Sequence, residues 1–151
     1  MAGGFRIKKE NISIFRDFLI KNFNNLQLNK SKNHNLHLDA KIAPSAMNED
    51  FYKEINVLAP FGSGNNEPKF MIENLKVIKS EVVANQHIKS LLLGLDGSVF
   101  KGMAWNAKDT PLESYLQKGN KKKFNIAGKM KLNEWRGKKD IEFMIEDISI
   151  N

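Results

Sequence analysis

The stretch Pro60-Phe61-Gly62-Ser63-Gly64-Asn65-Asn66-Glu67-Pro68 separates two parts of the sequence that have different patterns. Apolar residues recur mainly at helical spacing before it, whereas strand-like segments follow it. Its two prolines fix φ, and its glycines and asparagines tolerate the left-handed backbone conformations that a tight loop needs. The composition predicts a loop of one defined shape, which is either a plain connection or a functional loop.

Five strand-like segments follow this loop. A helix start separates the third from the fourth, with Thr110 placed as N-cap, Pro111 at the first helical position and Glu113 at the capping-box position. Asp96-Gly97 is typical of a two-residue type I′ hairpin turn, and Arg136-Gly137 holds the corresponding place between the last two strands. Three strands, a helix and two strands predict a five-stranded OB-fold barrel. The expected strands cover residues 70–83, 87–95, 99–105, 124–132 and 141–150.

The part before the loop predicts a small α/β fragment. Residues 11–25 carry apolar side chains three and four positions apart, which is typical of an amphipathic helix capped by Asn11. Alternation over 36–42 predicts a half-buried strand, and a short linker helix is expected after Asn48. The fold class is therefore α+β, mainly β. Its three expected parts are a small α/β fragment at 1–47, a linker helix and loop at 48–67, and an OB-fold at 68–151.

The charge of the chain favours a polyanionic partner. The 151 residues carry a formal net charge of +7, and between residues 118 and 139 nine Lys or Arg face only Glu134. The chain has no cysteine, no secretory signal and no apolar run near the roughly 18 residues of a membrane span. We therefore expect a cytoplasmic protein with no membrane partner and no thiolate chemistry.

The central loop resembles a signature of RecJ-type single-strand-specific exonucleases, Pro-Phe-Gly-x-Gly-Asn-x-Glu-Pro-x-Phe. Asn66 stands where that family more often has proline. Shorter patches at 87–89, 104–106, 132–137 and 145–148 are similar to patches of the RecJ OB-fold, in the same order and at similar spacing. The loop positions that match are Pro60, Phe61, Gly62, Gly64, Asn65, Glu67, Pro68 and Phe70.

The resemblance implies a C-terminal piece of a larger bacterial enzyme. Residues 1–47 would be the end of the DHH-associated domain, which the loop joins to the OB-fold, and the catalytic domains would lie upstream. Met1 would then be an internal methionine or an artificial start, the alternative being a natural protein that begins there. By the same resemblance, the parent enzyme would depend on Mg²⁺ or Mn²⁺ and act 5′ to 3′ on single-stranded DNA in recombination and repair.

The chain itself shows no pattern for hydrolysis. Two-metal hydrolysis needs at least four converging carboxylate or imidazole ligands, and the sequence has three scattered histidines and no Asp-His-His motif. His34, His37 and Asp39 are too unfavourably spaced for one ion and are better explained as outward-facing polar residues. We expect no catalysis, no metal and no cofactor in this part of the protein.

Basic and aromatic residues predict a binding site for single-stranded nucleic acid across the second and third OB strands and the adjoining loops. Trp135 is expected either to stack on a base or to pack at the rim. The register of Trp105 with Val99 and Met103 favours the barrel core for it, with stacking as the alternative. Lys129 and Lys131 share one strand face and need acidic partners, such as Glu142 and Glu146. The candidate residues are Lys89, Lys101, Trp105, Lys129, Lys131, Trp135, Arg136, Lys138 and Lys139.

Two further functions fit the same sequence. The OB-fold could be a protein-docking module that closes the nuclease or contacts single-strand-binding protein. It could also be a stand-alone RNA-binding protein. A second group of candidate site residues is the linker loop, with Pro60, Phe61, Gly62, Gly64 and Asn65.

Overall fold

The computed structural model describes residues 4, 6–28, 35–117, 122–135 and 137–150, without side-chain placement for 24–28 and 135. The chain separates into two compact units, residues 1–36 and residues 37–151. No described helix is long and apolar enough to cross a membrane.

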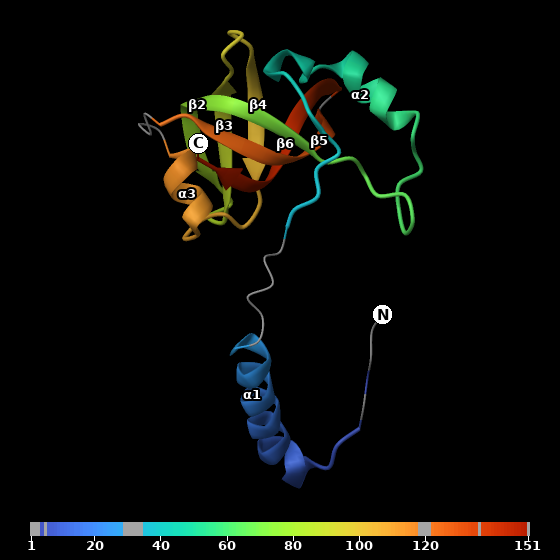
Figure 1. Ribbon diagram of the computed structural model, residues 1–151, viewed down its shortest axis with the longest axis vertical. Coiled ribbons are helices and arrows are strands. Elements are labelled where there is room, and N and C mark those ends of the chain that lie inside the picture. Colours follow the sequence, from blue (N-terminus) through green and yellow to red (C-terminus); the bar gives the residue numbers. More distant parts are fainter. Residues whose placement is uncertain (1–3, 5, 29–34, 118–121, 136, 151) are drawn as a thin grey trace. The chain divides into compact units, whose positions relative to one another are not determined.

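The second unit is built on a closed five-stranded barrel with the strand order β2-β3-β4-β6-β5, and β5 pairs back with β2. Neighbours are antiparallel except β4 and β6, which run parallel. This is the OB-fold that the sequence predicts (Figure 1). A short strand, β1, adds to β2 in parallel. The strands are β1 (Ala40–Lys41), β2 (Phe70–Val83), β3 (His87–Leu93), β4 (Val99–Ala104), β5 (Phe124–Trp135) and β6 (Lys138–Ser149).

Barrel closure depends on β2, because this strand pairs with two others in succession. Its first part, Phe70 to Leu75, pairs with β5, and its second part, from Lys76, pairs with β3. Between them the register with β5 shifts at Asn74, which has a φ of 60°. The backbone N–H of Asn74 donates to Asn125 Oδ1 at 3.0 Å, so the irregular residue is not left unsatisfied.

Alternating side chains fill the barrel. Phe124, Phe143 and Leu92 are at most 1% exposed, and Leu116 of α3 (Pro111–Leu116) is fully buried against them. At the start of α3, the hydroxyl of Thr110 donates to the Ala107 carbonyl, and the Thr110 side chain makes no capping hydrogen bond to the helix. The carboxylate of Glu113 accepts the N–H of Asp109 at 2.7 Å, so Thr110 holds the predicted N-cap position but the predicted capping box is not formed.

The segment that precedes the barrel packs against it. In the 3-10 turn η2 (Pro44–Ala46), the ring of Pro44 lies against Gly94, where any Cβ would clash. The helix α2 (Glu49–Asn56) buries Ile55 in the core and is capped by Asn48, whose side-chain oxygen accepts from the Phe51 N–H. Figure 1 shows α2 and α3 on opposite sides of the barrel. Residues 37–67 thus belong to the compact unit of the barrel, and the division at 47 and 67 stays a prediction about family domains.

The central loop has a defined conformation. Gly62 and Asn65 exchange two backbone hydrogen bonds around a turn in which Gly64 has a φ of 85°. The Asn65 amide nitrogen donates to the carbonyls of Leu58 and Pro60 at 2.8 and 3.0 Å, and the Ala59–Pro60 peptide is cis. These contacts explain why the loop combines glycine, asparagine and proline.

In the first unit, the predicted amphipathic helix is present as α1 (Ile12–Leu28). Asn11 does not cap it, because Asn11 ends a 3-10 turn, η1 (Lys9–Asn11), that leads directly into α1. Most of the apolar side chains of α1 are exposed, among them Ile14 at 68% and Phe23 at 60%.

Several details differ from the sequence predictions. The strand expected over 36–42 is only two residues long. Asp96-Gly97 is not a two-residue type I′ turn: the strands are joined by residues 94–98, and only Gly97 of the pair has a positive φ. The type I′ geometry belongs instead to Ala84 and Asn85, both with positive φ, between β2 and β3. Trp135 pairs with Lys138 and Gly137 has a positive φ, whereas Arg136, the other residue of the expected turn, lies outside the described residues.

A first prediction concerns Gly128, which lies in β5 where the backbone of β6 passes closely. A Cβ at this position would come within 1.9 Å of the Met144 carbonyl oxygen. We expect Gly128→Ala to lower the free energy of unfolding by about 3 kcal/mol, because the two backbones must separate. Gly62→Ala is the matched control, since nothing lies within 4 Å of its added Cβ and its φ is ordinary, and it should change stability by less than about 1 kcal/mol. Equal urea midpoints for the two variants would contradict the close approach.

A second prediction concerns acid stability. The pKa of Asp96 lies below its ordinary value of 3.8, chiefly because the Ser98 N–H donates to its carboxylate, with the Ser45 N–H as a further donor. Because folding lowers this pKa, the ionised Asp96 carboxylate stabilises the folded state. This stabilisation is fully present above the pKa of Asp96 in the unfolded chain, and it is lost as the pH falls through the pKa in the folded protein. Thermal melts between about pH 6 and about pH 2 should therefore show a shallower acid loss in Asp96→Asn than in the parent protein. Parallel curves for the two proteins would refute this role.

Candidate nucleic-acid interface

The strand register gathers most of the predicted lysines on the outer side of the barrel. Across β2, β3 and β4, one row contains Lys79, Leu91 and Lys101, and the next contains Glu81, Lys89 and Met103. The rows continue onto β6 and β5, where Glu142 stands beside Lys101 and opposite Lys131, and Met144 beside Met103 and opposite Lys129. We call this surface the lysine face. It consists of Lys79, Glu81, Lys89, Leu91, Lys101, Met103, Lys129, Lys131, Glu142 and Met144.

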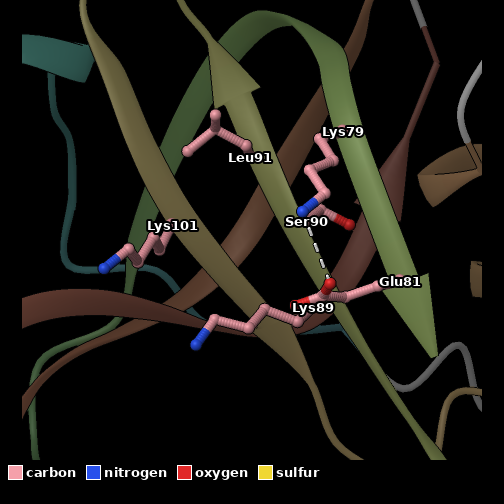
Figure 2. Close-up of a pocket in the computed structure, with 6 residues that line it drawn as sticks. All are labelled: Lys79, Glu81, Lys89, Ser90, Leu91 and Lys101. Atoms are coloured by element: carbon pink, nitrogen blue, oxygen red, sulfur yellow. Dashed lines mark ion pairs between the residues drawn. The ribbon is translucent and has the colours of Figure 1, made fainter. Parts of the chain in front are cut away.

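A pocket of about 190 Å³ opens in the lysine face over β3. Figure 2 shows Lys89 and Lys101 extending to the same side of it, while Lys79 reaches toward Glu81. Leu91 and Ser90 complete the lining. The volume lies below the roughly 300–1,000 Å³ of pockets for drug-sized ligands, so the pocket suits a single small group rather than a cofactor.

Carboxylates neutralise most of these lysines. Lys89 Nζ lies 3.2 Å from an oxygen of Glu142, whose side chain is only 8% exposed. Lys101 forms an ion pair with Asp140. Lys129 lies 3.2 Å from Glu67 and 3.9 Å from Glu146, which confirms the expected partnership with Glu146.

Lys131 differs from its neighbours. It stands opposite Glu142 in the strand register, as the sequence suggests, but Glu142 is committed to Lys89 and to the amide of Asn133 at 3.3 Å. Among the described residues Lys131 has no ion pair. It is thus the exposed cation of the lysine face that a ligand meets without displacing a carboxylate.

Trp105 lies on the outer surface, so the core position favoured for it is wrong. Its indole is 56% exposed, and the side chains of β4 that enter the barrel are those of Phe100 and Ala104, with Gly102 between them. The imidazole of His87 packs on it with ring centroids 4.2 Å apart, and its Nδ1 accepts the Asn106 N–H at 3.0 Å. Trp105 therefore presents a supported aromatic surface next to the row that holds Lys89 and Met103.

The remaining candidates lie at the β5–β6 hairpin and in the central loop. Lys138 and Lys139 are exposed, and Lys139 stands opposite Glu134. The side chain of Trp135 and all of Arg136 lie outside the described residues. In the central loop, Pro60, Gly62, Gly64 and Asn65 are exposed and Phe61 is half-buried. The contact of Glu67 with Lys129 joins the end of this loop to the lysine face.

Within the described part of the chain, no group of three or more His, Asp or Glu residues is placed to hold a metal ion. Asp39 is used structurally, since its carboxylate accepts the Lys69 N–H at 2.8 Å.

Comparison with known proteins assigns the barrel. A family model described as "RecJ OB domain" matches residues 38–147. The chain belongs to the RecJ OB domain family. The match begins close to the boundary of the second compact unit and includes α2 and the central loop.

Two relatives show how this RecJ OB domain compares with whole proteins. It is 24% identical over 153 residues to the single-stranded-DNA-specific exonuclease RecJ of Bacillus subtilis (strain 168), covering all of this chain and 19% of that protein. The crystal structure of RecJ in complex with Mn²⁺ from Thermus thermophilus matches with a TM-score of 0.52 and 21% identity, over 72% of this chain and 14% of that one. The chain thus spans about a fifth or less of the length of these relatives.

A third prediction tests the pairing in the RecJ OB domain. Lys89→Met leaves the nearly buried Glu142 carboxylate without its ammonium partner, and we expect a loss of about 1–3 kcal/mol in unfolding free energy at neutral pH. Lys131→Met is the matched control on the same face, and it should cost less than about 0.5 kcal/mol because no described ion pair is lost. Similar urea midpoints for both variants would show that the Lys89–Glu142 contact contributes little.

Proposed function

We propose that this chain is the single-stranded-DNA-binding region of a RecJ-type exonuclease of recombination and repair, acting 5′ to 3′ in the bacterial cytoplasm. The observation that carries this proposal is the lysine face, which lies over β3 and β4 with the exposed Trp105 at its end. In OB-folds the corresponding strands, the second and third of the barrel, bind oligonucleotides. The curated relative is named as specific for single-stranded DNA, which supports the same ligand class.

The chemistry of the face suits an unpaired strand. Lysine ammonium groups on neighbouring rows can follow a phosphate backbone, and an exposed indole can stack on a base. Bases in a duplex are already stacked on one another, so Trp105 selects against double-stranded DNA. Rigid support of the indole by His87 reduces the conformational entropy lost on binding.

The hydrolytic step belongs, in this proposal, to the rest of the parent enzyme. The relative from Thermus thermophilus is described in complex with Mn²⁺, and the parent of this chain would use Mg²⁺ or Mn²⁺ in the same way. The OB domain would hold the strand on its way to that metal site and would not cleave it.

A second candidate function is docking of another protein, such as single-strand-binding protein or the nuclease's own catalytic domains. Val57 and Leu58, between α2 and the central loop, are 82% and 59% exposed. Apolar side chains in such an exposed position favour a protein contact there. This surface is separate from the lysine face, so the two functions can be tested independently.

A fourth prediction tests DNA binding by fluorescence anisotropy of a labelled single-stranded oligonucleotide titrated with the chain. We expect Trp105→Ala to weaken binding by about 1–3 kcal/mol, or about fivefold and more, because one stacking platform is lost. Trp105→Phe keeps a ring and should retain most of the affinity. Unlabelled duplex DNA should compete poorly with the single strand, and single-stranded RNA tests the alternative of an RNA-binding protein.

Absence of binding to any single strand at low salt would overturn the proposal. The docking function would then be favoured if the parent chain binds single-strand-binding protein and the double variant Val57→Ser/Leu58→Ser does not. Tighter binding of RNA than of DNA would favour the RNA-binding alternative.

A further inference from the structure

Most lysines of the lysine face are paired with carboxylates of the face or of its borders, although the chain is basic. Lys79, Lys89, Lys101 and Lys129 each have a carboxylate within ion-pair distance, and Glu146 also holds Lys69 at 2.6 Å. The formal excess of positive charge therefore lies mostly elsewhere in the chain, for example at Lys138 and Lys139. A surface selected only for tight phosphate binding would not place a carboxylate beside four of its five lysines.

The carboxylates differ in how firmly they are held. Glu142 is nearly buried, lies between Lys101 and Lys131 in the strand register and also accepts from the side-chain amide of Asn133. Asp140, Glu67 and Glu146 are between about a third and two fifths exposed, at 41%, 38% and 33%. Ion pairs this exposed are worth about 0–1 kcal/mol, so a phosphate can replace their carboxylates at small cost.

We propose that the lysine face is a charge-compensated track, on which each lysine that has a carboxylate partner exchanges that carboxylate for a DNA phosphate as the strand binds. This inference rests on the proposed function and specifies how the same site holds its ligand. The number of ion pairs stays nearly constant during the exchange, so no single strand position is strongly favoured. A strand held in this way can advance along the face by repeated exchange of partners.

Carboxylates and DNA phosphates compete for the same lysines, so the carboxylates determine both the affinity for DNA and its salt dependence. A freed carboxylate remains beside the bound phosphate and repels it, which lowers the affinity. It also retains a cation, which reduces the net release of counterions from about 0.7 per phosphate contact on a single strand. Removing a carboxylate charge should therefore strengthen binding and make it more sensitive to salt.

The fifth prediction uses the full chain with Asp140→Asn and Glu146→Gln, singly and together, and a labelled oligothymidine at several salt concentrations. Each substitution should tighten binding about two- to fivefold at low salt. The slope of log K against log salt should become more negative by up to about 0.7 for each carboxylate removed. Glu142→Gln should act in the same direction, and thermal melts establish that each variant is folded before its affinity is compared.

Glu54→Gln is the matched control, because it removes one negative charge from the exposed surface of α2, outside the lysine face. It should leave affinity and slope close to those of the parent chain. Binding by the parent chain with no gain in the face variants beyond this control would overturn the charge-compensated track and leave the proposed function standing. Weaker binding by the folded Asp140→Asn variant would also overturn it, because the carboxylate would then be positioning Lys101. If the parent chain does not bind the oligonucleotide, the proposed function itself fails.

Discussion

The bend of β2 at Asn74 is the constraint on which the barrel depends. Around Asn74, β2 has one more residue than β5 between their paired positions, and such a bulge bends the strand and increases its twist. The shift at Asn74 lets the first part of β2 reach β5 while the second part pairs with β3. Its cost is an irregular backbone N–H inside the sheet, which the side chain of Asn125 satisfies. Closure then fixes the register of all five strands, and with it the rows of the lysine face.

The same closure accounts for the composition of both sides of the sheet. At Gly128 the backbones of β5 and β6 approach so closely that a side chain has no room. At Gly102 a Cβ would meet Ile145 and Leu92, so the large side chains of other strands fill the barrel in front of β4. The alternate side chains of β4, those of Val99, Lys101 and Met103, lie on the outer side of the barrel, and Trp105 follows them there. The core is filled without them.

These features separate what the sequence could predict from what it could not. Local signals were sufficient for the bounds of β2, the start of α3 and the presence of the helix after Asn48, since each depends on neighbouring residues. Trp105 was misassigned because alternation shows that Val99, Met103 and Trp105 share a side without showing which side. Gly102 and Ala104 decide the question, because they face the core. Their small size does not indicate a core position in the sequence, since side chains of other strands, such as Ile145 and Leu92, fill the space beside Gly102. Likewise, Glu142 was expected as a partner of Lys129 or Lys131, but its ion-pair partner is Lys89, which reaches it across β4 from a strand far earlier in the sequence.

Stability and ligand binding are coupled in this arrangement through the buried carboxylate. When Lys89 contacts a phosphate, Glu142 loses part of the interaction that makes its burial tolerable, so the free energy of that phosphate contact is reduced by the same amount. Lys131, with no described ion pair, bears no such cost and can retain its full contribution. The lysines of one face therefore differ in what they can give to a ligand, although their charge is the same. Lysines that are already paired with carboxylates contribute less to the affinity for DNA than unpaired ones. A count of basic residues in the sequence therefore overestimates that affinity.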